Sequence, residues 1–180
     1  MSSTDSSTGS AAAHAGGDSA NVVEKTSRSE EETEAIGRRL AEALPPHTVV
    51  ALCGPLGAGK TVFARGVAAG LGIDPALVTS PTFVYLVDYP EGRIPFVHAD
   101  LYRFGDVPGE LVEGAFESIG LEAALAGDAI VLIEWWPFHR GIEPERIVLV
   151  ELAVESGDVR SIRLNFRGPG LGAALARVSQ

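Results

Sequence analysis

The chain has 180 residues, 46% of them hydrophobic, and a formal net charge of −10 at pH 7. This length suits one domain with a proper core, and an acidic chain without a Lys/Arg cluster argues against strong direct binding to RNA or DNA. No apolar run has the length of a membrane span, and the N-terminus lacks a secretory pattern. We therefore expect a cytoplasmic protein without membrane contact. The single cysteine, Cys53, cannot form an internal disulfide, which fits a reducing cytosol.

The N-terminal region divides into a tail and the start of the domain. Residues 1–21 are mostly Ser, Ala, Gly and Asp, which have almost nothing to bury, so we expect a disordered tail before a single domain over residues 22–180. Structure should begin near Ser29, which has capping-box spacing to Glu32 at the start of a helix. The apolar face of this helix consists of Ile36, Leu40, Ala43 and Leu44. Two prolines then end it.

The strongest motif is the glycine loop Gly54 to Thr61 (GPLGAGKT), which fits the phosphate-loop pattern G-x-x-x-x-G-K-[ST] at every position. A buried strand is predicted before it at 48–53 and a helix after it at 62–71. Glycines let successive backbone N–H groups point at phosphate oxygens, and the helix adds the positive end of its dipole. We expect Lys60 to contact the β- and γ-phosphates of a nucleotide and the Thr61 hydroxyl to ligate Mg²⁺.

The elements after the loop helix indicate the fold class. Strands at 83–89 and 94–98 are separated only by a turn and should pair antiparallel. One broken helix or two short ones follow over 106–126, and the apolar run 129–133 predicts a strand at the centre of a sheet covered on both faces. Strands at 147–154 and 161–166 and a short helix from 168 complete the chain. We therefore predict a three-layer α/β domain of the P-loop NTPase type, whose mixed, mainly parallel sheet includes an antiparallel hairpin.

Two acids lie at the ends of predicted strands. A P-loop enzyme needs such a carboxylate to hold Mg²⁺, and Glu134, directly after the most apolar strand, is interpreted as that ligand rather than as a solvated acid. Asp100 could orient the attacking water, act as an outer-shell magnesium partner, cap the next turn or pair with Arg103. Arg65 and Arg103 are candidates for γ-phosphate contact, although surface ion pairs are commoner.

Other polar and aromatic residues have weaker signals. Ser80 and Thr82 flank a proline in a loop that could fold over the γ-phosphate, but turn and strand-initiation chemistry is the better interpretation from the residues alone. Trp135 and Trp136 would point to opposite faces of a strand, so that one is in the core and the other is available to a partner. His98 is interpreted as structural.

Four segments, GPLGAGKT, SPTF, VHADLYRF and LIEW, resemble the bacterial TsaE (YjeE) family in their order and spacing. The resemblance runs from about Ser27 to Phe166. It implies the ATPase component of the system that makes threonylcarbamoyladenosine in tRNA, with ATP and Mg²⁺ as cofactors. It also implies the two-subunit threonylcarbamoyl transferase, TsaB with TsaD, as partner.

The resemblance also assigns residues. It implies that Lys60, Asp100 and Glu134 serve catalysis and that Thr61 and Glu134 hold the metal. The implied nucleotide-binding residues are Ser27, Thr33, Gly57, Ala58, Gly59, Lys60, Thr61, Val62, Ser80, Thr82 and Trp135. Ser80 and Thr82 belong to a switch-like loop, and residues 27–33 border the adenine. The chain departs from the family at three positions: Pro55 often is Asp, Val62 often is Thr, and Ala99 often is aromatic.

Other functions remain open from the sequence. A small-molecule kinase is one, although no basic lid segment is obvious. A GTPase is less favoured, because the Asn-Lys-x-Asp motif that reads guanine is absent. A nucleotide-gated binding module, in which ATP occupancy rather than turnover shapes an interaction surface, is a third.

Overall fold

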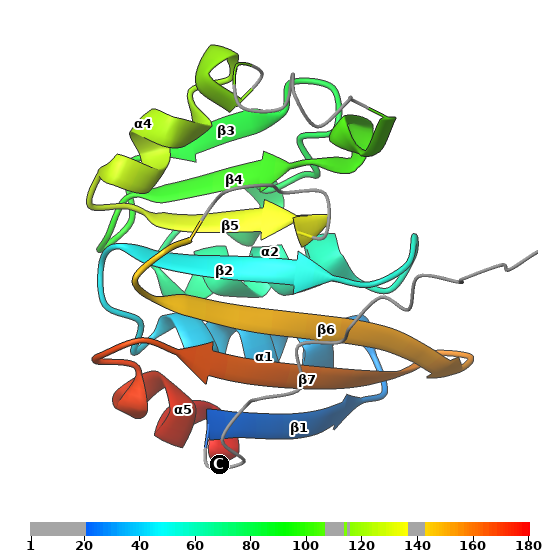
Figure 1. Ribbon diagram of the computed structural model, residues 1–180. Coiled ribbons are helices and arrows are strands. Elements are labelled where there is room, and N and C mark those ends of the chain that lie inside the picture. The colour runs from blue at the N-terminus through cyan, green and yellow to red at the C-terminus, as the bar shows by residue number, and fades with distance from the viewer. Residues whose placement is uncertain (1–20, 107–113, 115, 137–142) are drawn as a thin grey trace, which may run out of the picture.

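The computed structural model describes residues 21–106, 114, 116–136 and 143–180, which form one sheet with helices on its two faces (Figure 1). The strands are β1 (Val22–Ser27), β2 (Thr48–Cys53), β3 (Leu86–Tyr89), β4 (Phe96–Asp100), β5 (Ile130–Glu134), β6 (Ile147–Ser156) and β7 (Val159–Arg167). The helices are α1 (Glu30–Ala41), α2 (Lys60–Gly70), α4 (Leu121–Ala126) and α5 (Gly172–Ser179), with short 3-10 segments η2 (Pro75–Leu77) and η3 (Tyr102–Asp106).

The sheet has the order β1-β7-β6-β2-β5-β4-β3 among the described residues. Strand β2 pairs in parallel with β5 and β6, and β4 pairs in parallel with β5, whereas β3, β7 and β1 join antiparallel. The predicted α/β class, the mixed sheet and the antiparallel hairpin are confirmed. Because β2, β4 and β5 run in the same direction, their carboxyl ends meet at one edge of the sheet, where Asp100 lies opposite Glu134.

Two apolar cores cover the two faces of the sheet. One lies under α1, α2 and α5 and includes Leu40, Phe63 and Val178. The other lies under α4 and includes Leu121 and Trp136. Strand β5 alternates between them and is buried along its whole length, as its apolar sequence predicts.

Close packing of α1 on α2 depends on small residues. A Cβ on Gly66 would lie 2.1 Å from the carbonyl oxygen of Glu34, and one on Gly37 would lie 2.5 Å from that of Phe63. Glycine therefore lets the two helix backbones touch. The N-terminal turn of α1 is thereby held beside the glycine loop that precedes α2.

The first helix begins as predicted and ends earlier. The Ser29 Oγ accepts the Glu32 N–H at 3.2 Å, while the Glu32 carboxylate accepts the N–H of Arg28, one residue before the position that a capping box expects. The helix ends at Ala41 rather than running to the prolines. Leu44 is nevertheless buried, because the chain turns back onto the core.

Three predictions about strands need correction. Structure begins with β1, not near Ser29. The sequence of this edge strand, VVEKTS, does not alternate apolar and polar residues and so gives no strand signal. The predicted strand 83–89 begins only at Leu86, since Tyr85 has a left-handed backbone (φ 67) and Phe83 is 85% exposed. Its partner extends to Asp100, so that residue ends β4 rather than following it.

Some predicted segments lie outside the residues that the structure describes. The predicted tail lies almost wholly outside the described residues, as does the first part of the segment 106–126. Its second part contains α4, and the predicted C-terminal helix is α5. In the described part of the chain, no helix is both long and apolar enough to cross a membrane.

Candidate functional site

The glycine loop leaves β2 and enters α2 through backbone conformations that favour glycine. Gly57 and Gly59 have φ values of 79° and 97°. At Gly54 (φ 146°) a Cβ would also lie 2.4 Å from the carbonyl oxygen of Leu152. These residues leave the loop backbone open for close approach of a ligand.

Lys60, the first residue of α2, is 5% exposed and directed back into the loop. Its Nζ donates to the carbonyl oxygens of Gly54 and Pro55, both at 2.9 Å, and lies 3.7 Å from the ring centroid of Trp135. Burial lowers the pKa of Lys60, while the charges of Glu134 and then Asp100 raise it. A buried cation whose partners here are two carbonyl oxygens and an aromatic ring is well placed to receive an anion.

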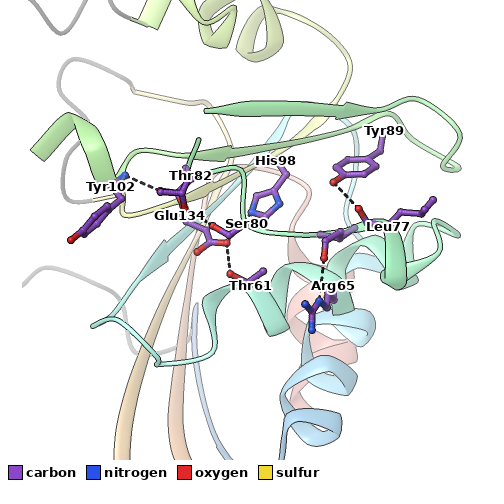
Figure 2. A network of polar contacts seen from close by, with 11 residues as sticks. Thr61, Arg65, Leu77, Ser80, Thr82, Tyr89, His98, Tyr102 and Glu134 are labelled. Atoms are coloured by element: carbon purple, nitrogen blue, oxygen red, sulfur yellow. Dashed lines mark hydrogen bonds and ion pairs between the residues drawn. The ribbon is translucent and has the colours of Figure 1, made fainter. Parts of the chain in front are cut away.

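Glu134 is 3% exposed and accepts two hydrogen bonds on one oxygen. The Thr61 hydroxyl donates to its Oε1 at 3.0 Å, and Nε2 of His98 lies 3.0 Å from the same oxygen (Figure 2). The structure therefore joins the two predicted magnesium ligands. It also adds His98, which contacts a candidate ligand in addition to packing in the core.

Asp100 accepts hydrogen bonds from the loop that precedes β3. Its Oδ2 accepts the hydroxyls of Ser80 at 2.7 Å and Thr82 at 2.6 Å, and its Oδ1 accepts the N–H of Tyr102 at 2.8 Å. Of the alternatives for Asp100, the turn cap is present, whereas no ion pair with Arg103 is found among the described residues. The interpretation of Ser80 and Thr82 as turn residues is confirmed, because the N–H of Val84 donates to the carbonyl oxygen of Pro81 at 3.0 Å. Their interpretation as strand initiators is wrong, since β3 begins at Leu86.

A cavity of about 480 Å³ brings these residues together. Its lining comprises Glu30, Thr33, Leu56, Gly57, Gly59, Lys60, Thr61, Val62, Ser80, Thr82, Asp100, Tyr102, Glu134, Trp135 and Arg160. Most of the sequence-predicted site residues lie here. Ser27 and Ala58 do not: Ala58 is buried, and the Ser27 hydroxyl is buried against that of Thr33 at 2.7 Å.

Arg160, from the start of β7, is the cation that sequence reasoning missed. Its Nε lies 3.6 Å from where a Cβ on Gly59 would be, and its guanidinium also donates to the carbonyl oxygen of Asp158. Arg65 and Arg103 do not line the cavity; Arg65 donates to the Val78 carbonyl oxygen at 3.1 Å. Arg160 reaches the glycine loop because the long β6–β7 hairpin carries it there. No sequence motif indicates this position for Arg160.

The two adjacent tryptophans separate for a reason other than strand alternation. Strand β5 ends at Glu134, and Trp135 has a left-handed backbone with φ 61°. Trp136 is buried in the core under α4, as predicted for one of the pair. Trp135 turns to the cavity, where its ring contacts Lys60 and lies 4.9 Å from that of Tyr102.

The oxygen ligands at the start of α2 and the end of β5 suit Mg²⁺. The Thr61 hydroxyl and the Glu134 carboxylate are hard oxygen ligands, and magnesium bound with a nucleotide takes its other ligands from phosphates and water. No group of three or more His, Cys, Asp or Glu side chains that could hold a metal ion is found within the described residues. The oxygens of Thr61 and Glu134 therefore fit a metal ion whose other ligands are phosphate and water.

A glycine loop between a parallel strand and a helix, with an acid at the end of the neighbouring strand, defines a P-loop protein of the α/β class. The family model described as "Threonylcarbamoyl adenosine biosynthesis protein TsaE" matches residues 27–162. The chain therefore belongs to the TsaE family, which has its role in tRNA threonylcarbamoyladenosine biosynthesis.

Individual relatives agree with the family. The TsaE protein of Bacillus subtilis is 41% identical over 138 residues, covering 77% of this chain and 82% of the relative. The TsaE protein of Treponema pallidum is 36% identical over 136 residues, covering 76% of this chain and 95% of the relative. The crystal structure of Bacillus subtilis YdiB superposes with a TM-score of 0.69 at 28% identity, covering 88% of this chain and 94% of YdiB.

Proposed function

We propose that this chain is an Mg²⁺-dependent ATP-binding and ATP-hydrolysing subunit required for threonylcarbamoyladenosine modification of tRNA. It acts with a TsaB/TsaD-type threonylcarbamoyl transferase. One observation carries the proposal: the glycine loop, Lys60, Thr61, Asp100 and Glu134 surround one cavity. Membership of a tRNA-modification family and the single cysteine favour a cytoplasmic location, and the acidic chain favours tRNA contact through the partners.

The chemistry follows from fixed charges. Lys60 exchanges its carbonyl partners for phosphate oxygens, and the loop N–H groups stabilise the charge that spreads over the transferred phosphoryl group. Thr61 and Glu134 would hold Mg²⁺, which supplies charge neutralisation at the phosphates. Both oxygens of Asp100 accept hydrogen bonds, so we assign it the positioning of the Ser80–Thr82 loop over the phosphates.

Release of γ-phosphate in the presence of the transferase pair tests the proposal. Lys60→Ala should abolish this release, because it removes the cation that contacts the β- and γ-phosphates. Unchanged release by Lys60→Ala would refute the assignment of the loop. Transfer of labelled phosphate to a metabolite instead of water would support the kinase alternative.

A nucleotide-gated binding module is the second candidate, and one observation favours it. Phe83 and Val84, which are 85% and 61% exposed, lie in the loop that Asp100 ties to the site. Nucleotide binding could therefore change how these apolar side chains are presented to a partner. Glu134→Gln separates the candidates: a module that needs only occupancy keeps its modification activity when hydrolysis is lost but nucleotide still binds.

A further inference from the structure

His98 lies on the face of β4 that leads directly to the candidate metal site. Phe96, His98 and Asp100 share this face by strand alternation. On the adjacent strand β5, Leu132 pairs with His98 and Glu134 with Asp100. The imidazole is fully buried and stacks against the Phe96 ring at 6.2 Å. It therefore has a fixed position between the apolar core and the carboxylate of Glu134.

The only side-chain hydrogen bond of His98 within the described residues goes to Glu134. Nε2 lies 3.0 Å from Oε1, whereas the buried Nδ1 has no hydrogen-bond partner in this part of the chain. A carboxylate oxygen accepts, so the ring must present Nε2–H to it; the other neutral tautomer would place two lone pairs face to face. Nε2 of the ring is therefore the protonated nitrogen that faces Glu134.

This arrangement has a cost that packing alone does not explain. An apolar side chain of similar size would fill the same place without leaving a buried, unpartnered nitrogen. Within the described residues, the hydrogen bond that the polar ring makes goes to Glu134. Two donors, the Thr61 hydroxyl and the His98 Nε2–H, approach the same oxygen from different elements, α2 and β4, and together fix the orientation of a flexible side chain.

We infer that His98 is the positioning residue of the magnesium site, holding Oε1 of Glu134 through Nε2–H. The inference rests on the proposed function, because it takes Glu134 as a ligand of the metal that arrives with ATP. Outer-shell partners that orient a metal ligand typically change metal affinity or activity by about 10- to 100-fold when removed. The effect should therefore appear in the magnesium requirement for nucleotide binding.

Two amide substitutions separate the two ring nitrogens. His98→Gln places an N–H near the position of Nε2, and His98→Asn places one near that of Nδ1. Binding of a fluorescent ATP analogue is titrated with Mg²⁺ and repeated in EDTA. We expect His98→Asn to raise the magnesium midpoint about 10-fold or more, His98→Gln to stay within about threefold of wild type, and affinity in EDTA to be equal in all three.

Equal magnesium midpoints for the two variants would overturn the inference. So would a loss of analogue affinity in EDTA as large as the loss measured with Mg²⁺. Thermal melting shows whether each variant is folded. Should either variant fail to fold, the ring ¹⁵N spectrum of the unmodified protein decides. A proton on Nε2 whose signal shifts in Glu134→Gln supports the inference. A proton on Nδ1 with none on Nε2, or an Nε2 signal unmoved by Glu134→Gln, refutes it. Failure of the wild-type protein to bind the analogue with Mg²⁺ would instead count against the proposed function.

Discussion

At the scale of single residues, the buried Lys60 ammonium links stability to pH. Burial lowers its pKa from the usual 10.5 in the nucleotide-free protein. Between the lowered value and 10.5 the unfolded chain holds more protons at this position, so the contribution of Lys60 to the free energy of unfolding rises with pH in that window. Lys60→Met has no such group. The melting temperature of wild type relative to Lys60→Met should therefore rise as the pH approaches 10.5.

Comparing these two proteins cancels the titration of the groups that do not interact with Lys60. Melting is followed by circular dichroism from neutral to alkaline pH without nucleotide. A difference in melting temperature that stays constant, or that turns against wild type with rising pH, contradicts the assignment of a lowered Lys60 pKa.

Arg160 gives a second prediction at this scale. Its guanidinium lines the cavity beside Gly59, so Arg160→Ala should weaken binding of ATP and ADP by about tenfold, since a hydrogen bond to a charged group contributes about 1.5–3 kcal/mol. Arg163→Ala is the matched control, because Arg163 is on the same strand, lies 3.8 Å from Glu24 and does not line the cavity. Calorimetric titration measures both. Equal effects of the two substitutions would exclude a specific nucleotide contact.

At the scale of elements, the contact between α1 and α2 depends on Gly66. Gly66→Ala would drive a methyl group into the Glu34 backbone, which cannot move without shifting α1. Overpacking of this kind costs about 1–3 kcal/mol, and the shift would also displace Thr33 from the cavity. We expect a lower urea midpoint and weaker nucleotide binding.

Gly172→Ala in α5 is the control for this substitution. A Cβ there meets nothing within 4 Å, so alanine should be neutral or stabilise by about 0.4–1 kcal/mol, because it restricts the unfolded chain. If both variants unfold at the same urea concentration, the close helix contact does not control stability.

Elements with local signals could be predicted, whereas those defined by distant pairing could not. The β2 strand, the loop and α2 follow from apolar runs and glycine spacing. The β1 strand forms by pairing with β7, in which Leu164 lies opposite Val23. This partner is far away in the sequence, so that no local pattern predicts the strand. The left-handed residue Tyr85 delays β3 in a way that no propensity indicates.

The site divides in the same way. Lys60, Thr61 and Glu134 follow from the motif and from the end of an apolar strand. The bonds of Asp100 to Ser80 and Thr82 depend on how the intervening loop folds back, which spacing alone does not determine. His98 had a usable signal, because it shares a strand face with Asp100, two residues away. Arg160 had none.

At the scale of the whole molecule, the proposed site couples ligand binding to global unfolding. A ligand that binds only the folded state stabilises it by about 2.7 kcal/mol at one hundred times its dissociation constant. For a domain of this size that shifts the melting temperature by about 5–10 °C. Saturating ATP with Mg²⁺ should produce such a shift in wild type, since the loop, α1, β5 and β7 all line the cavity that the ligand would fill.

Differential scanning fluorimetry with matched ligands and variants makes this prediction specific. Lys60→Ala should still unfold in one cooperative transition but lose the shift on adding ATP, because the loop keeps its glycines and lacks the cation. GTP should give a smaller shift than ATP, since the chain has no guanine-reading motif. A full rise in the melting temperature of Lys60→Ala on adding ATP would place the nucleotide elsewhere on the molecule. A larger rise with GTP than with ATP would reverse the assignment of the base. In both cases the stabilising contacts would come from residues other than those proposed for the site.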